Sequence, residues 1–185
     1  MKKKQKKQLL YEVTVPSGVD VSLNHPVTVK GPNGELSKSF KMINIVLEKK
    51  DNNIIISSKR SAKREKKLMC SIKAHIKNMI AGVQEPFVYK MQICSVHFPM
   101  SVTLDKQNHL LKIKNFFGET KERTAKLLEG VSVEVNGDII TIISCDIEKA
   151  GQTAANIEAS TRVRNKDRRI FQDGIFIISK AGEEI

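Results

Sequence analysis

The sequence lacks tryptophan and is poor in cysteine and in aromatic residues, and each shortage excludes a class of protein. The three cysteines are far apart, odd in number and without a C-x-x-C pair: Cys70, Cys94 and Cys145. Neither a disulfide framework nor a zinc site is therefore expected, and a reducing compartment fits. Aromatic residues make up only 5% of the chain. Proteins that stack single-stranded bases usually carry more of them, so recognition of backbone and shape is favoured over base stacking.

Long apolar runs and catalytic motifs are also missing. No apolar run approaches the roughly 20 residues that cross a bilayer, and the N-terminus lacks the apolar segment of a signal peptide. The G-x-S-x-G, P-loop and G-x-G-x-x-G patterns are absent. None of the four histidines has a second histidine four residues away, so no metal site is indicated. We expect no enzymatic activity, no metal and no cofactor.

Positive charge dominates what is present. Lysine and arginine total 32 against 20 acidic residues, which gives a net charge of +12. This balance favours a polyanionic partner, with nucleic acid first and an anionic membrane second. Membrane binding would need an apolar or lipid anchor beside the basic residues. The sequence shows no such anchor, so no membrane partner is expected.

The strongest basic segment lies near the C-terminus. Five cations fall between Arg162 and Arg169, with Asp167 as the one acid among them. The apolar residues 175–178 follow, which predicts a basic loop held rigid by a buried strand. Because arginine binds phosphate through two hydrogen bonds, this loop is a candidate phosphate-binding site. The alternative is a loop that only improves solubility.

Two other basic segments are each open to more than one interpretation. Residues 1–8 are almost all Lys and Gln and predict a flexible arm, which either lies on phosphates, directs nuclear import or only improves solubility. Residues 59–67 hold six cations and one acid, at the start of a predicted amphipathic helix that ends at Gly82. These cations either contact phosphate or form a solvated helix start.

The two halves of the sequence repeat the same patterns in the same order. Three segments, which begin at residues 16, 29 and 53, recur at residues 99, 113 and 138, and a helical stretch follows in both halves. This repeat predicts a duplicated α/β protein of the α+β type, in which each domain is a small β-sheet with a helix packed on one face. We expect an arm at 1–8, a first domain at 9–84 and a second at 87–179. The second domain carries an extension, residues 163–178, which includes the basic segment.

Six segments also carry a resemblance to a known family. They are Val29-Lys30-Gly31-Pro32-x-Gly34, the helix from Cys70 to Val83, Tyr89-Lys90-Met91, His97-Phe98-Pro99, Asn115-Phe116-x-Gly118-Glu119 and Asn165-Lys166-Asp167-x-Arg169-x-Phe171-x-Asp173-Gly174-Ile175. Over about Leu10 to Lys180 the chain resembles the universal large-subunit ribosomal protein six family, called protein nine in eukaryotic ribosomes. The last segment is the most specific and is of eukaryotic type. The chain departs from the family pattern at Phe176, where Tyr is usual, and at Ala159, where Gln is usual.

The resemblance implies a structural constituent of the large ribosomal subunit. It implies binding to large-subunit rRNA near the sarcin-ricin region, with neighbouring ribosomal proteins and translation factors close by. It also implies a cytoplasmic location, with nuclear or nucleolar assembly if the source is eukaryotic. The alternative is a basic RNA-binding or RNA-chaperone module that acts off the ribosome.

Charge and resemblance together predict the residues that contact rRNA. They are Arg162, Arg164, Asn165, Lys166, Arg168, Arg169, Asp173, Gly174 and Lys180. The cations would neutralise phosphates of a folded helix junction. Asn165 and Asp173 would either shape the loop or touch a 2′-hydroxyl.

Overall fold

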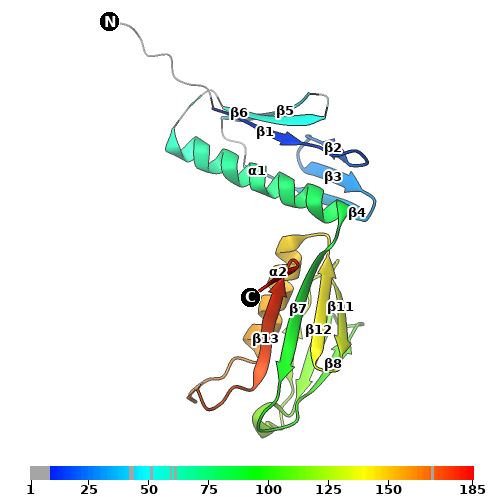
Figure 1. The fold of residues 1–185 in the computed structure, drawn as a ribbon, viewed down its shortest axis with the longest axis vertical. Coiled ribbons are helices and arrows are strands. Elements are labelled where there is room, and N and C mark those ends of the chain that lie inside the picture. The colour runs from blue at the N-terminus through cyan, green and yellow to red at the C-terminus, as the bar shows by residue number, and fades with distance from the viewer. Residues whose placement is uncertain (1–8, 42–43, 51, 59, 61, 168) are drawn as a thin grey trace, which may run out of the picture. The chain divides into compact units, whose positions relative to one another are not determined.

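A computed structural model describes residues 9–41, 44–50, 52–58, 60, 62–167 and 169–185. The chain divides between Glu85 and Pro86 into two compact units (Figure 1). The predicted arm at residues 1–8 lies outside the described residues. Neither described helix combines the length and the hydropathy that crossing a membrane requires.

The first unit pairs two small sheets with one long helix. Strands β1 (Leu9–Thr14), β6 (Asn53–Ser58) and β5 (Ile45–Lys50) form one antiparallel sheet in that order. The other sheet contains β2 (Asp20–Ser22), β3 (Val27–Gly31) and β4 (Gly34–Lys38). Helix α1 (Lys63–Gln84) packs on both sheets. Alternate residues of β6, Ile54 and Ile56, are fully buried in the core that the helix closes, because side chains alternate between the two faces of a strand.

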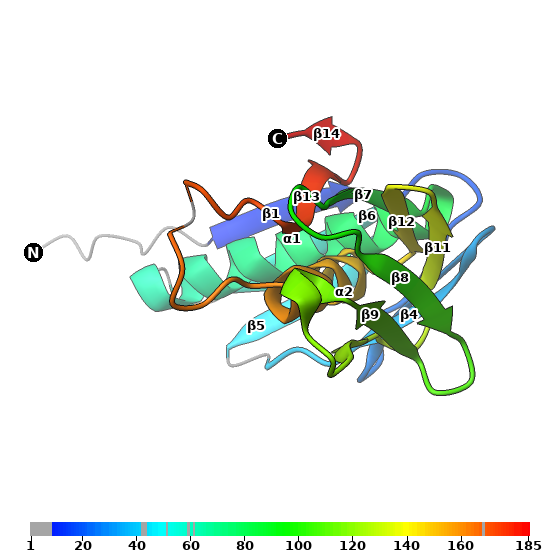
Figure 2. The same cartoon turned by 90° about the horizontal axis from the view of Figure 1, so that it is seen from below.

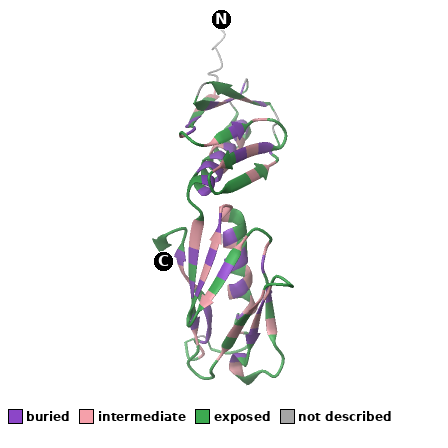
Figure 3. Ribbon diagram, turned by 90° about the vertical axis from the view of Figure 1, so that its right-hand side faces the viewer, coloured by how far each residue is buried: buried purple, intermediate pink, exposed green. Residues whose placement is uncertain are grey.

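The second unit repeats this plan and adds to it. Its larger sheet has the order β11 (Ser132–Asn136), β12 (Ile139–Ser144), β7 (Phe87–Cys94), β13 (Gly174–Lys180) and β14 (Glu183–Glu184). The smaller sheet contains β8 (Ser101–Asp105), β9 (Leu110–Lys114) and β10 (Arg123–Lys126). A short 3-10 turn, η1 (Phe116–Gly118), follows β9. Helix α2 (Ile147–Ser160) packs on both sheets. Within each unit, the buried residues lie where the helix and the sheets of that unit face each other (Figure 3).

Comparison of the units confirms the predicted duplicated α/β architecture. The order β1-β6-β5 corresponds to β7-β12-β11, and a helix follows the hairpin in both cases. Strand β13 then pairs along the outer edge of β7. The described part of the first unit has no strand at the corresponding edge of β1. The predicted extension therefore enters the fold as an added strand between β7 and β14, and the basic segment lies on the connection before it.

Several predicted boundaries were wrong. Helix α1 runs past Gly82, which is buried inside the helix, and ends at Gln84. The alanine-rich residues 150–161 predict the second helix, but α2 begins at Ile147, because the side chain of Asp146 accepts the N–H of Glu148 at 2.9 Å and caps the helix.

Candidate nucleic-acid interface

The predicted basic segment forms a loop whose two ends are tied together. This basic loop, residues 161–173, leaves the end of α2 and returns to the start of β13 (Figure 2). At its base, the buried Thr161 hydroxyl accepts the backbone N–H of Ile175 at 3.0 Å and donates to the carbonyl of Glu158 at 3.2 Å. These two bonds join the helix end to the strand start, so the loop is closed at its base.

A buried carboxylate fastens the loop to a different part of the unit. One oxygen of Asp173 accepts the backbone N–H groups of Val96 and His97, at 2.8 and 2.9 Å. The other lies 2.6 Å from His97 Nδ1. We call these three residues the Asp173 anchor. Asp173 is only 3% exposed, and its bonds reach the segment between β7 and β8, 76 residues away in sequence.

The hydrogen bonds also determine the charge of the anchor. Burial raises the pKa of Asp173, but the hydrogen bonds from the His97 backbone, the His97 ring and the Val96 backbone outweigh burial and lower it. The carboxylate is therefore ionised at neutral pH and acts only as an acceptor. The anchor thus consists of charge-assisted bonds, which are stronger than bonds between neutral groups.

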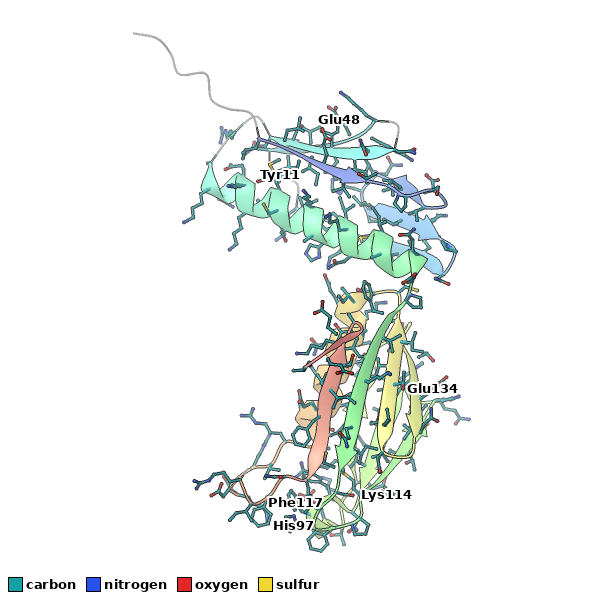
Figure 4. All side chains as sticks on the ribbon, in the orientation of Figure 1. Tyr11, Glu48, His97, Lys114, Phe117 and Glu134 are labelled. Carbon is teal, nitrogen blue, oxygen red and sulfur yellow. The ribbon has the colours of Figure 1, made fainter. Side chains whose placement is uncertain are left out.

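Aromatic rings gather beside the anchor. The centroid of the Phe171 ring lies 5.2 Å from that of His97 and 5.7 Å from that of Phe117. Phe117 in turn packs edge-on against the buried Phe116, at 4.6 Å. We call these four residues the aromatic cluster, and two of them, His97 and Phe117, are labelled side by side in Figure 4. Lys166 Nζ lies 4.5 Å from the Phe171 centroid and 5.2 Å from that of Phe117, a position typical of a cation–π contact.

The structure brings most of the predicted contact residues together on the loop. Arg162, Arg164, Asn165, Lys166 and Arg169 are all exposed there. Arg169 forms an ion pair with Asp167, with Nη2 2.8 Å from Oδ2. Its side chain is 90% exposed, and such exposed pairs contribute little to stability, so the guanidinium is available to a stronger anionic partner. Arg168 lies outside the described residues.

Of the three other predicted contact residues, two are buried and one lies away from the loop. Asp173 and Gly174 are buried, so neither presents a surface to RNA. Of the two roles predicted for Asp173, the hydrogen bonds support loop shaping. Lys180 is exposed but stands at the far end of β13, six residues from Gly174. At about 3.3 Å per residue this is roughly 20 Å, so Lys180 does not belong to the loop.

Sequence reasoning missed Arg123, on β10. Its guanidinium binds both oxygens of Glu119, at 2.8 and 2.6 Å. It also donates to the carbonyl of Ser160 at 3.0 Å and lies 4.2 Å from the Phe116 centroid. Arg123 thus holds the end of α2, where the loop begins. Nothing in the sequence indicated this role, because Ser160 is 37 residues away.

Basic residues of the first unit do not settle the alternatives left open. Lys63, Arg64, Lys66 and Lys67 occupy the first turns of α1 and are exposed, which fits phosphate contact and a solvated helix start equally. Among the residues that the structure describes, no group of His, Cys, Asp and Glu is placed to hold a metal ion. The structure describes all three cysteines, and none of them forms a disulfide.

Known proteins are similar to this chain over most of its length. The family model described as Ribosomal protein L6 matches residues 15–86 and residues 98–174, one region in each half. Three archaeal proteins named Large ribosomal subunit protein uL6 are similar to it. The Methanobrevibacter smithii protein is 44% identical, over 91% of this chain and 94% of its own. The Staphylothermus marinus protein is 43% identical, over 94% of this chain and 95% of its own. The Methanosarcina mazei protein is 40% identical, over 95% of this chain and 99% of its own. The resemblance predicted from the six segments is confirmed.

Proposed function

Because the chain belongs to the ribosomal protein L6 family, we propose that it is a structural constituent of the large ribosomal subunit that binds large-subunit rRNA through the basic loop. The observation that carries this proposal is the Asp173 anchor. It holds exposed cations on a loop of fixed position, which a loop that only improves solubility would not need.

The chemistry of the loop suits a folded RNA. Arg162, Arg164 and Lys166 are exposed, and each releases condensed counterions when it neutralises a phosphate. Side chains cannot read the deep, narrow major groove of A-form RNA, so contacts to phosphate and to 2′-hydroxyl groups are expected to dominate. Arg169 would exchange Asp167 for a phosphate in the complex. The relatives are named as proteins of the large ribosomal subunit. We propose that this chain likewise has no enzymatic activity.

The finer location belongs to the same proposal. We place the loop near the sarcin-ricin region, with neighbouring ribosomal proteins and translation factors close by, on the basis of the resemblance carried by residues 165–175. We also propose a cytoplasmic location on the ribosome. Nucleolar assembly was expected only for a eukaryotic source, and the three relatives described above are archaeal, so it has no support.

Salt dependence tests the proposal. Five neutralised phosphates imply a slope of roughly −4, or shallower for folded RNA, when the logarithm of the affinity for protein-free large-subunit rRNA is plotted against that of the salt concentration. Replacing Arg162, Arg164 and Lys166 together by Ala should reduce the magnitude of the slope by roughly 2 to 3.

A variant with equal charge loss serves as the control. Lys41, Lys106 and Lys126 are exposed and lie outside the loop, and replacing them by Ala should leave the slope nearly unchanged. Equal slopes for the two triple variants would refute the role of the loop. Sedimentation of the wild-type protein through a high-salt sucrose cushion separates the ribosomal function from an off-ribosome RNA chaperone. Stable co-sedimentation with large subunits is expected.

A further inference from the structure

An open groove of about 750 Å³ runs beside the basic loop, within the second unit. Its walls come from the exposed side of α2, the two ends of the basic loop, the start of β13, and the end of β7 with the residues that follow it. The lining that matters here consists of Val96, Ala155, Ala159, Arg162, Phe171 and Phe176. The groove has the volume of a small-ligand site, since such sites measure about 300 to 1,000 Å³.

Two of the lining residues are aromatic, although the chain has only nine aromatic residues in all. Phe176 is 36% exposed, and its ring rests on the backbone of Gly174. A Cβ atom at residue 174 would lie 3.1 Å from Phe176 Cζ. Phe171 is fixed by its contacts in the aromatic cluster. The groove therefore offers aromatic surface that the protein already holds in place.

The charge at the groove favours a nucleotide over an apolar protein segment as its occupant. The exposed Arg162 lies on the lining of the groove, and the cations of the basic loop continue from it. The acidic residues on the lining are Glu158 and Asp173, and the Asp173 carboxylate is already bound by the backbone of Val96 and by the backbone and ring of His97. A flat apolar surface next to a guanidinium matches a nucleotide, because its base stacks on aromatic rings and its phosphate pairs with arginine. An apolar protein segment would use the aromatic surface but would leave the cation without a partner.

We propose that this groove receives an unpaired nucleotide of the bound RNA, whose base stacks on Phe176 and whose phosphate pairs with Arg162. The proposal rests on the proposed function and deepens it. It adds one stacked base to an interface for which the low aromatic content favours recognition of backbone and shape.

The test compares two phenylalanines in the full-length chain. Phe176→Leu keeps an apolar side chain and removes the aromatic face, so its Kd for protein-free large-subunit rRNA should rise about tenfold. Because no charge changes, the salt slope should match that of the wild type. Phe98 is 47% exposed and does not line the groove, and Phe98→Leu should bind as the wild type does. Equal Kd values for the two variants would overturn the proposal.

A fluorescent reporter gives an independent readout. Since the chain has no tryptophan, Phe176→Trp introduces a single indole at the groove. Its emission should be quenched by the rRNA and by a single-stranded adenosine octamer, but not by an abasic octamer of equal charge. Quenching by the abasic octamer, or none by any RNA, would overturn the proposal.

The outcomes also separate this proposal from the function on which it depends. A normal Kd for Phe176→Leu, with a reduced slope for the triple loop variant, would refute nucleotide stacking and leave rRNA binding intact. An unchanged slope for the triple loop variant would refute both. If Phe176→Leu bound rRNA normally but detached from large subunits in the high-salt cushion, a protein segment would occupy the groove instead of a nucleotide.

Discussion

Replacing Asp173 by asparagine tests the anchor with the least change of shape. The amide oxygen of Asn can still accept the two backbone N–H groups of Val96 and His97. Its nitrogen, however, would face His97 Nδ1 in place of a carboxylate oxygen that lies 2.6 Å away. The variant therefore loses one charge-assisted bond and weakens two others. Because a hydrogen bond to a charged group contributes about 1.5 to 3 kcal/mol, we expect a loss of about 2 kcal/mol in the free energy of unfolding of the second unit.

Thermal melting followed by circular dichroism measures this loss. For a domain of this size, 1 kcal/mol corresponds to about 4 to 8 °C, so the Tm of the second unit should fall by roughly 8 to 16 °C. Below the new Tm, the affinity for rRNA should still be lower than that of the wild type. The released loop must be ordered again on binding, at about 1 to 2 kcal/mol per backbone residue fixed.

Asp105→Asn is the matched control. It makes the same change in net charge in the same unit, but Asp105 pairs with Lys112 at the surface, with the two atoms 2.8 Å apart. Its Tm should fall less than that of Asp173→Asn, and its affinity for rRNA should remain close to that of the wild type, because Asp105 does not hold the loop. If Asp173→Asn and Asp105→Asn melted at the same temperature and bound rRNA equally, the reasoning that makes Asp173 the fastening of the loop would be refuted.

Two further predictions concern stability alone. Gly31→Ala places a Cβ atom 2.6 Å from Val83 Cγ2 and 3.0 Å from the Val83 carbonyl oxygen, so the first unit should lose about 1 to 3 kcal/mol in chemical denaturation; an unchanged midpoint would contradict this close approach of β3 to α1. The hydrogen bond from Lys112 lowers the pKa of Asp105 to about 2. Since this pKa is below that of the unfolded chain, the stabilisation is present above about pH 4 and is lost as the pH falls toward 2. Any difference in Tm between the wild type and Asp105→Asn should disappear over that range, and a difference that grew on acidification would reverse the assigned sign.

The sequence predicted the architecture because strands, hairpins and the buried face of a helix produce patterns among residues that are close together in the chain. Short isoleucine-rich runs place β6 and β12, and the turn residues before each of these strands mark the hairpins. The period of α1 identified its buried face. Helix ends were less well predicted, because they depend on individual bonds. The cap at Asp146 moved the start of α2, and packing kept Gly82 inside α1 rather than at its end.

The site was predicted in part for the same reason. The density of cations at residues 162–169 is a local property, and it located the loop. The bonds that hold the loop join residues far apart in sequence, such as Asp173 with His97 and Arg123 with Ser160, and only the folded chain brings them together. The aromatic content is an average over the chain, so it did not indicate the gathering of Phe116, Phe117 and Phe171 in one cluster. Contact of the loop with rRNA stays a prediction.

The position of β13 has a consequence for solubility. This strand pairs with β7, which is eight residues long, and so occupies backbone N–H and C=O groups that would otherwise face water. A chain shortened after residue 160 would expose that row of groups as a template on which strands of other molecules can pair. Truncated chains of this kind are expected to aggregate before a loss of RNA affinity can be measured. The same segment thus protects the chain from pairing with other molecules and carries the basic loop. A deletion of this segment would remove both properties together.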